Sequence, residues 1–458
     1  MRTLVGCLAA ALLLTAAPGA TAYPLDGFRE TGITRLEAYR LAQDGLLKSR
    51  ALYTGALLPS KKVRLRMRDH RDFRLPDQPD PEFTAAVRGL LGDDAARYGI
   101  AVLDLTNPAA PRYAEIGGDK IQNPGSVGKI MVALAWMQAL ADIYPDDVAA
   151  RKRILRESQI RANEFIVHDE HTVPFWRPGE PRVVKRAIEV GDTANVWTYL
   201  DWMCSSSSNA AASMLMWHLM LLKHFGAAYP PSPAEADHFL KAASNREKSR
   251  LFLDAIRSPL SRNGLDPQKL RQGSFFTRRG KQLVSGTNSI ATPRELMRYA
   301  LFMEQGKLVD EWSSLEIKRL LYLTDRRIRY ASSPALSDAA VYFKSGSLYS
   351  CKPEEGFECK KYHGNRKNFM NSLTLVETTD RKQPLDYVSV VLSNVLRKNS
   401  AVAHQTLATR IHRLIQGRYD QSFTSRVRSM AADPELREKA KALIGTSDDE
   451  SSDSRPGR

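Results

Sequence analysis

A turn leads directly into an uninterrupted apolar segment at residues 123–136, which read Asn123-Pro124-Gly125-Ser126-Val127-Gly128-Lys129-Ile130-Met131-Val132-Ala133-Leu134-Ala135-Trp136. Proline and glycine predict the turn, and a helix that is apolar on all sides is a buried helix. Residues three apart share a helix face, so the Lys129 amine is expected beside the Ser126 hydroxyl at the start of this helix. A lysine that loses its water in apolar surroundings has a lowered pKa and can activate a serine as a nucleophile. The spacing arises often by chance, so the alternative is a surface serine with a lysine lying along apolar surface.

Two later stretches supply further polar groups. They are Ser207-Ser208-Asn209, which precedes three alanines, and Lys344-Ser345-Gly346, which follows an apolar segment. Ser207 is chosen from a run of four serines because it stands two residues before Asn209. The alternative is that the serine run only caps the helix that follows.

In this order the three motifs resemble the signature of class A β-lactamases and penicillin-binding proteins, and the class A enzymes more closely than the rest. The resemblance spans about residues 83–417. It implies an α/β (α+β) fold of the β-lactamase/transpeptidase-like kind, in which an antiparallel sheet is flanked by helices and joined to an all-helical subdomain.

The resemblance also implies roles for the residues of the first two motifs. Ser126 would attack a carbonyl carbon, and Lys129 would take its proton directly or through water. Ser207 would return a proton to the leaving nitrogen. Asn209 would position Lys129 and the substrate amide.

The third motif would bind the substrate. Lys344 and Ser345, followed by Gly346, would hold a substrate carboxylate by charge and hydrogen bond. By resemblance, the backbone N–H groups of Ser126 and Ser347 would form the oxyanion hole.

One group that class A β-lactamases carry is missing. In those enzymes a glutamate after the second motif, with an asparagine four residues later, activates the water that releases the acyl group. Between Asn209 and Ser285 the only glutamates are Glu235 and Glu247, and neither has an asparagine four residues on. Glu247 is the weak candidate for a deacylation base. Without such a base an acyl-enzyme would persist.

The chain has 458 residues, of which 43% are hydrophobic and 26% charged, as in ordinary soluble globular proteins. Residues 1–22 combine a basic residue, an apolar centre and a small-residue cleavage site, which predicts a secretory signal peptide. No later stretch approaches the ~18–20 continuous apolar residues of a membrane span. We therefore expect a periplasmic or secreted protein with no transmembrane segment in the mature chain.

Loss of Arg2 with the signal peptide lowers the formal net charge from +16 to +15. This charge favours an anionic envelope polymer as a partner, because no nucleic-acid motif accompanies it. A charge that only keeps the protein soluble is the alternative.

Three cysteines remain in the mature chain. Cys351 and Cys359 lie eight residues apart in a chain bound for an oxidising compartment, which predicts a disulfide. Cys204 is expected to be a small core residue. His168 and His171 would ligate zinc only from a helix, and their neighbours predict a loop, so we expect no metal and no cofactor.

The sequence divides into a signal peptide (1–22), an N-terminal extension (23–82), the hydrolase domain (83–417) and a partly disordered C-terminal tail (418–458). In the extension, basic and apolar residues alternate over 62–68, which predicts a strand, with a polyanion-binding ridge as the sharper alternative. Further strands are expected at 98–105, 113–116, 371–376 and 387–392, and helices at 195–203, after Thr292 and at 402–415.

These patterns together predict an exported β-lactamase-like serine hydrolase that forms an acyl-enzyme on Ser126. Its substrate would be a β-lactam or a related amide or ester that carries a carboxylate. One alternative is a D-alanyl-D-alanine peptidase acting on peptidoglycan. The other is a protein that binds a β-lactam or cell-wall ligand without turnover.

Overall fold

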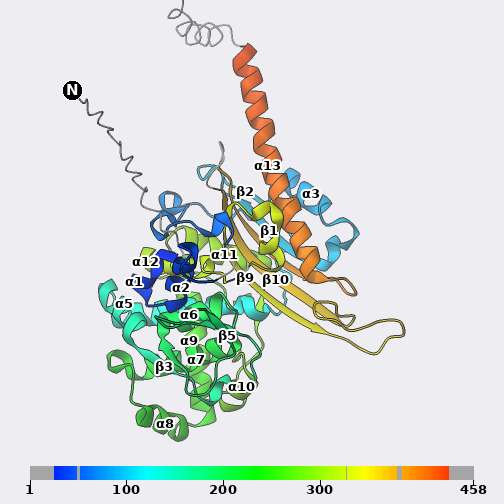
Figure 1. The fold of residues 1–458 in the computed structure, drawn as a ribbon. Coiled ribbons are helices and arrows are strands. Elements are labelled where there is room, and N and C mark those ends of the chain that lie inside the picture. The colour runs from blue at the N-terminus through cyan, green and yellow to red at the C-terminus, as the bar shows by residue number, and fades with distance from the viewer. Residues whose placement is uncertain (1–24, 49–51, 326, 379–383, 433–458) are drawn as a thin grey trace, which may run out of the picture.

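The computed structural model describes residues 25–48, 52–325, 327–378 and 384–432 (Figure 1). The signal peptide predicted for residues 1–22 and residues 433–458 of the predicted tail lie outside these ranges.

A five-stranded antiparallel sheet forms one half of the molecule, with the strand order β2-β1-β11-β10-β9. Its strands are β1 (Tyr98–Asp104), β2 (Arg112–Ile116), β9 (Ala339–Ser350), β10 (Lys367–Thr378) and β11 (Asp386–Asn394). Every residue of β1 is buried, as expected of a strand whose two faces are both covered. The sequence predicted β1, β2, β10 and β11, and each prediction is confirmed.

Helices cover both faces of this sheet. Ile100 and Val102 of β1 belong to one apolar cluster, together with residues of α3 (Pro81–Gly89) and α13 (Ser400–Ala432). Ala101 and Leu103 belong to the other cluster, which includes residues of α11 (Pro293–Glu304), α12 (Glu311–Tyr322) and α4 (Lys129–Ile143). This alternation follows from the two-residue period of a strand. Helix α13 runs beyond its predicted end at residue 415 and projects past the sheet in Figure 1.

The other half is helical and occupies the lower part of Figure 1. Besides α4 it contains α5 (Val148–Glu157), α6 (Val196–Cys204), α7 (Asn209–Phe225), α8 (Pro233–Ala242), α9 (Asn245–Arg262) and α10 (Arg278–Leu283). Short strand pairs accompany these helices: β3 (Gln159–Arg161) with β6 (Thr193–Asn195), β4 (Val173–Phe175) with β5 (Val184–Arg186), and β7 (Leu270–Arg271) with β8 (Ile290–Ala291). The antiparallel sheet flanked by helices and the largely helical half confirm the predicted fold class.

Helix α4 lies at the centre of the helical half. Its first twelve residues, from Lys129 to Leu140, are all buried. Among the described residues, only Gly125–Ile143 has the length and hydropathy of a membrane span, and 83% of its apolar window is buried inside the protein. This is the burial expected of a core helix.

The N-terminal segment packs firmly on the rest of the chain through α1 (Phe28–Thr31) and α2 (Thr34–Gln43). Arg35 of α2 forms a bidentate ion pair with Asp201 of α6, at 2.6 and 2.5 Å, and the two side chains are 2% and 0% exposed. A buried pair of this kind fixes α2 on α6, because separating the two charges would leave each one desolvated.

The prediction of a strand at residues 62–68 is wrong. The chain instead forms two single-turn 3₁₀ helices, Ser60–Lys62 and Arg68–His70, joined by an irregular segment. Val63 and Met67 are both buried, and the backbone N–H groups of Arg66 and Met67 donate to Glu304 at the end of α11. These contacts with the end of α11, rather than pairing with another strand, determine the conformation of residues 62–68.

Candidate active site

Ser126 lies in a tight turn of 3₁₀ helix, η6 (Gly125–Gly128), directly before α4. The Asn123 side chain accepts a hydrogen bond from the Gly125 N–H at 2.9 Å, and Gly125 has a positive φ of 55°. Gly346 of β9 packs against this turn so closely that a Cβ atom on it would lie 2.5 Å from the Ser126 nitrogen. Only glycine fits there, which explains the glycine of the third motif.

The Lys129 amine is 3.1 Å from the Ser126 hydroxyl oxygen. The same amine lies 2.6 Å from the Ser207 carbonyl oxygen and 2.8 Å from Asn209 Oδ1. Both of these oxygens only accept hydrogen bonds. A neutral amine has two N–H donors for them and one lone pair, which is then left for the Ser126 hydroxyl proton.

The surroundings of Lys129 favour this neutral form. The side chain is completely buried, and its burial lowers the pKa well below the ordinary value of 10.5, with the nearby Lys344 charge acting in the same direction. The amine also lies 4.8 Å from the centre of the Phe276 ring. Lys129 is therefore suited to accept a proton from Ser126.

The second motif forms the turn between α6 and α7, where Ser207 has a positive φ of 60°. Ser208 caps α7 by accepting the Ala211 N–H at 3.1 Å. Asp169 holds the turn from the other side, because its Oδ2 accepts from the Ser208 hydroxyl at 2.9 Å and from the Ala210 N–H at 2.7 Å. The two interpretations of the serine run both apply, to neighbouring residues: Ser208 caps the helix and Ser207 faces the lysines.

The third motif brings Lys344 to the same place from β9. Its amine lies 2.8 Å from the Ser207 hydroxyl, and burial with the nearby Arg329 charge lowers its pKa to about 7. The Ser345 hydroxyl accepts a hydrogen bond from Arg329 at 2.8 Å. Lys129 of the first motif and Lys344 of the third motif thus both lie close to the Ser207 hydroxyl.

The two amides expected to form an oxyanion hole meet at the contact between η6 and β9. A Cβ atom on Gly125 would lie 3.3 Å from the Ser347 nitrogen, and one on Gly346 would lie 2.5 Å from the Ser126 nitrogen. Asn371 of β10 ties the sheet to this turn by donating to the Asn123 carbonyl at 2.9 Å. The structure therefore brings together all eight predicted residues of the three motifs, including Ser347.

Six of these eight residues line a cavity of about 370 Å³: Ser126, Ser207, Asn209, Lys344, Ser345 and Ser347. Four lysine or arginine side chains line it, and none of the described residues that line it is aspartate or glutamate: the cations are Lys281, Arg329, Lys344 and Lys361. A cavity with this excess of positive charge attracts negatively charged ligands.

Glu247 does not lie at this site. It stands in the first turn of α9, where its carboxylate accepts the Ser244 N–H at 2.8 Å and its own N–H donates to the Ser244 hydroxyl at 3.2 Å. Glu247 is exposed and serves as a helix cap, a role that the serine-x-x-glutamate spacing itself indicates.

Gln272 lines the cavity beside the turn that carries Ser126, and no sequence pattern indicated it. It is 4% exposed, and its Oε1 atom has no hydrogen-bond partner among the described residues. A Cβ atom on Gly128 would lie 2.1 Å from this oxygen, so the amide touches the backbone between Ser126 and Lys129. No local sequence pattern indicates Gln272, because only the folded chain brings residue 272 next to Gly128.

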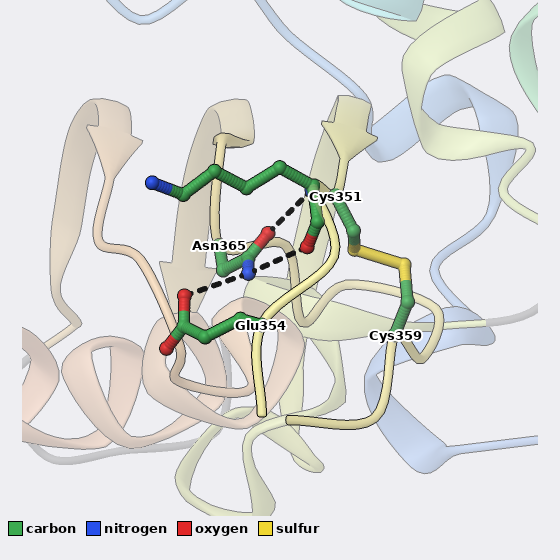
Figure 2. The surroundings of a disulfide bond; sticks show 5 residues. Cys351, Glu354, Cys359 and Asn365 are labelled. Atoms are coloured by element: carbon green, nitrogen blue, oxygen red, sulfur yellow. Dashed lines mark hydrogen bonds between the residues drawn. A yellow bond between two sulfur atoms is a disulfide. The ribbon is translucent and has the colours of Figure 1, made fainter. Parts of the chain in front are cut away.

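The predicted disulfide between Cys351 and Cys359 is present (Figure 2). Cys204 is buried, as predicted, and burial raises its thiol pKa to about 12. His171 lines the cavity, and its Nδ1 atom lies within hydrogen-bond distance of Asp169 Oδ1, at 2.6 Å. The described residues contain no group of three side chains that could hold a metal ion.

No family model matches the chain, and no curated protein matches it. Similar solved structures include a β-lactamase from Sphaerobacter thermophilus DSM 20745, with 15% identity, a TM-score of 0.45 and coverage of 72% of this chain and 96% of that one. Another is PBP-A, with 12% identity, a TM-score of 0.44 and coverage of 75% and 100%. A third is a β-lactamase from Chitinophaga pinensis DSM 2588, with 15% identity, a TM-score of 0.43 and coverage of 72% and 97%.

Proposed function

We propose that this protein is a β-lactamase-like serine hydrolase in which Ser126 forms an acyl-enzyme with a β-lactam or a related amide or ester. The contact of 3.1 Å between the Lys129 amine and the Ser126 hydroxyl carries this proposal, since the lysine is buried and has a lowered pKa. A nucleophilic serine needs such a base.

In the first step, Lys129 takes the Ser126 proton while the oxygen attacks the substrate carbonyl carbon. The negative charge that develops on the carbonyl oxygen is stabilised by the N–H groups of Ser126 and Ser347. Loss of one such donor typically costs about 3 kcal/mol in the transition state.

In the second step, the bond to the leaving nitrogen breaks and the nitrogen takes a proton from the Ser207 hydroxyl. Ser207 is resupplied from the lysines on either side of it, with Lys344 at 2.8 Å and Lys129 at 3.4 Å. Lys344 and Ser345 bind the substrate carboxylate, which explains why the substrate is expected to carry one.

Release of the acyl group is proposed to be slow. Hydrolysis of the ester requires a base for the incoming water, and the described cavity wall has no carboxylate. The neutral amide of Gln272 lies beside the nucleophile instead. The same observation favours the second candidate, a D-alanyl-D-alanine peptidase whose acyl-enzyme with a β-lactam is long-lived. Digestion of purified muropeptides separates the two activities.

We further propose export to the periplasm or the cell exterior, which the leader-like residues 1–22 and the Cys351–Cys359 disulfide support.

The test is the intact mass of the protein over time after benzylpenicillin is added. We expect an increase by the mass of the penicillin, its absence in Ser126→Ala, and a rate at least about 100-fold lower in Lys129→Met. Ser205→Ala is the matched control, because Ser205 lines the same cavity but donates to the Asp201 carbonyl at 2.8 Å. An adduct that persists in Ser126→Ala would refute the assignment of the nucleophile.

A further inference from the structure

A long loop between β9 and β10, residues 351–366, folds back to the cavity. Two of its residues, Lys361 and Tyr362, are part of the cavity wall. The loop is well anchored: besides the disulfide, Asn365 exchanges hydrogen bonds of 2.9 and 3.0 Å with the backbone of Lys352 and donates to Glu354 at 2.9 Å (Figure 2). Such anchoring keeps the ends of a long loop in one arrangement.

Tyr362 is held in an unfavourable backbone conformation. Its φ is +66°, a left-handed value that costs a non-glycine residue free energy, so the surrounding structure must impose it. The turn is closed by the His363 N–H, which donates to the Lys360 carbonyl at 3.0 Å. Ser400 at the start of α13 donates to the Tyr362 carbonyl from both its N–H and its hydroxyl, at 3.0 and 3.1 Å.

The result of this conformation is a phenol surrounded by cations. Arg329 donates to the Tyr362 hydroxyl at 3.0 Å and its guanidinium lies 4.8 Å from the ring centre, while the Lys361 amine lies 5.4 Å from that centre. Burial raises the pKa of this phenol, yet the two cations reverse the shift and leave the pKa below its ordinary value. The potential at this side of the cavity is therefore positive.

These cations have no carboxylate partner in the part of the chain that the structure describes. Among the described residues, neither Arg329 nor Lys361 forms an ion pair with a carboxylate, and the Arg329 Nε atom is buried without a hydrogen-bond partner. One substrate carboxylate at Lys344 and Ser345 would leave the charge of Lys361 uncompensated. Through Lys361, the loop of residues 351–366 thus adds positive charge beyond what a single substrate carboxylate requires.

We propose that Lys361 and Tyr362 form a second anion subsite, so that the preferred substrate is a dianion with one carboxylate at Lys344 and Ser345 and a second one at the loop. The proposal rests on the proposed function, because it assumes that acylation of Ser126 reports substrate binding. Arg329 positions the Tyr362 hydroxyl between the two carboxylates. The Lys361 amine supplies the charge for the second one.

The test compares two penicillins that differ by one carboxylate: benzylpenicillin and its α-carboxy derivative, carbenicillin. The second-order rate constant of acylation is measured for each by intact mass or stopped flow. We expect a carbenicillin-to-benzylpenicillin ratio above one in the parent protein, and a ratio at least about threefold lower in Lys361→Gln. Added salt should lower the ratio as well. Lys352→Gln is the matched control, because it removes an exposed lysine of the same loop that does not line the cavity.

The double variant Cys351→Ser with Cys359→Ser provides a second test that removes no cation. Loss of the disulfide should loosen the loop and lower the carbenicillin-to-benzylpenicillin ratio, as Lys361→Gln does. A ratio of one or less in the parent, or an equal loss in Lys352→Gln, would overturn the second subsite while leaving the proposed function intact. Failure of both penicillins to acylate the parent would instead overturn the proposed function, and the subsite with it.

Discussion

Replacement of Gln272 by glutamate is expected to turn a persistent acyl-enzyme into one that releases its acyl group. The Gln272 amide is almost completely buried and touches the backbone at Gly128, between Ser126 and Lys129. An amide cannot accept a proton, whereas a carboxylate of the same shape can. Water that reaches the Ser126 ester would then have a general base beside it.

The size of the effect follows from what such bases contribute. General-base catalysis typically supplies ~10²- to 10⁴-fold in rate, which lowers the deacylation barrier by about 3–5 kcal/mol. Burial of a new carboxylate is expected to raise its pKa, so the gain should grow with pH as the carboxylate ionises. The same burial should lower the free energy of unfolding by about 1–3 kcal/mol.

The assay uses protein that has been acylated with benzylpenicillin and freed of excess ligand, and it follows the loss of the adduct by intact mass. Gln272→Ala is the control, because it removes the amide without supplying a base. If the adduct of Gln272→Glu lasts as long as that of the parent, the amide does not stand at the position of the deacylating water. If Gln272→Ala releases the adduct equally fast, looser packing rather than a base accounts for the gain.

Two further predictions concern charge. The second-order rate constant of acylation should follow a bell-shaped pH profile: it falls at low pH as Lys129 gains a proton, and it falls above about pH 7 as Lys344, whose pKa is lowered to about 7, loses the charge that binds the substrate carboxylate. A rate that stays constant up to pH 9 would contradict this assignment. Arg35→Met should lower the free energy of unfolding by about 3–5 kcal/mol, because it leaves the buried Asp201 carboxylate without its partner. Arg40→Met on the same helix should cost less than about 1 kcal/mol, since its ion pairs are partly exposed to solvent. Equal losses for the two variants in a denaturant titration would show that the buried pair has no special role.

The central features of the fold could be predicted because local patterns specify them. The apolar segment after Lys129 predicted a buried helix, and α4 is one. Thr292, followed by proline and then Glu295, predicted the start of α11, and the Thr292 hydroxyl accepts the Glu295 N–H at 3.2 Å. The spacing of two residues before Asn209 selected Ser207 from the serine run, and the structure places the Ser207 hydroxyl 2.8 Å from the Lys344 amine.

The remaining features depend on contacts between distant parts of the chain. Arg35 pairs with a residue 166 positions away, so nothing in its own neighbourhood indicates that it is buried. Gln272 reaches the cavity from an irregular segment and Arg329 from the first residue of a short 3₁₀ helix, Arg329–Ser332, and no periodicity marks either of them. A local pattern also gave a wrong prediction where tertiary contacts determine the backbone conformation. At residues 62–68 the alternation of basic and apolar residues predicted a strand, but no partner strand lies beside this segment among the described residues.

Backbone conformation adds a clue that is invisible in the sequence. Of the six non-glycine residues with positive φ in the described chain, three line the cavity: Ser207, Arg329 and Tyr362. Such conformations persist only where the surroundings impose them, and they gather at functional sites. Their convergence on one cavity from three separate segments of the chain indicates that side-chain placement there matters more than local stability.

In the proposed reaction, the two buried lysines would let substrate binding prepare Ser126 as the nucleophile. Lys129 and Lys344 both approach Ser207, and burial and the Lys344 charge lower the pKa of Lys129 more than the Asp169 carboxylate raises it. Their protonation is therefore coupled, and one charge is tolerated more easily than two. A substrate carboxylate that binds at Lys344 favours the proton there, which leaves Lys129 neutral and ready to act as the base. Once Lys129 has taken the Ser126 proton, two positive charges flank Ser207, and their repulsion drives a proton through its hydroxyl to the leaving nitrogen. Groups whose environments separate their protonation states in this way are suited to act as base and acid in one reaction.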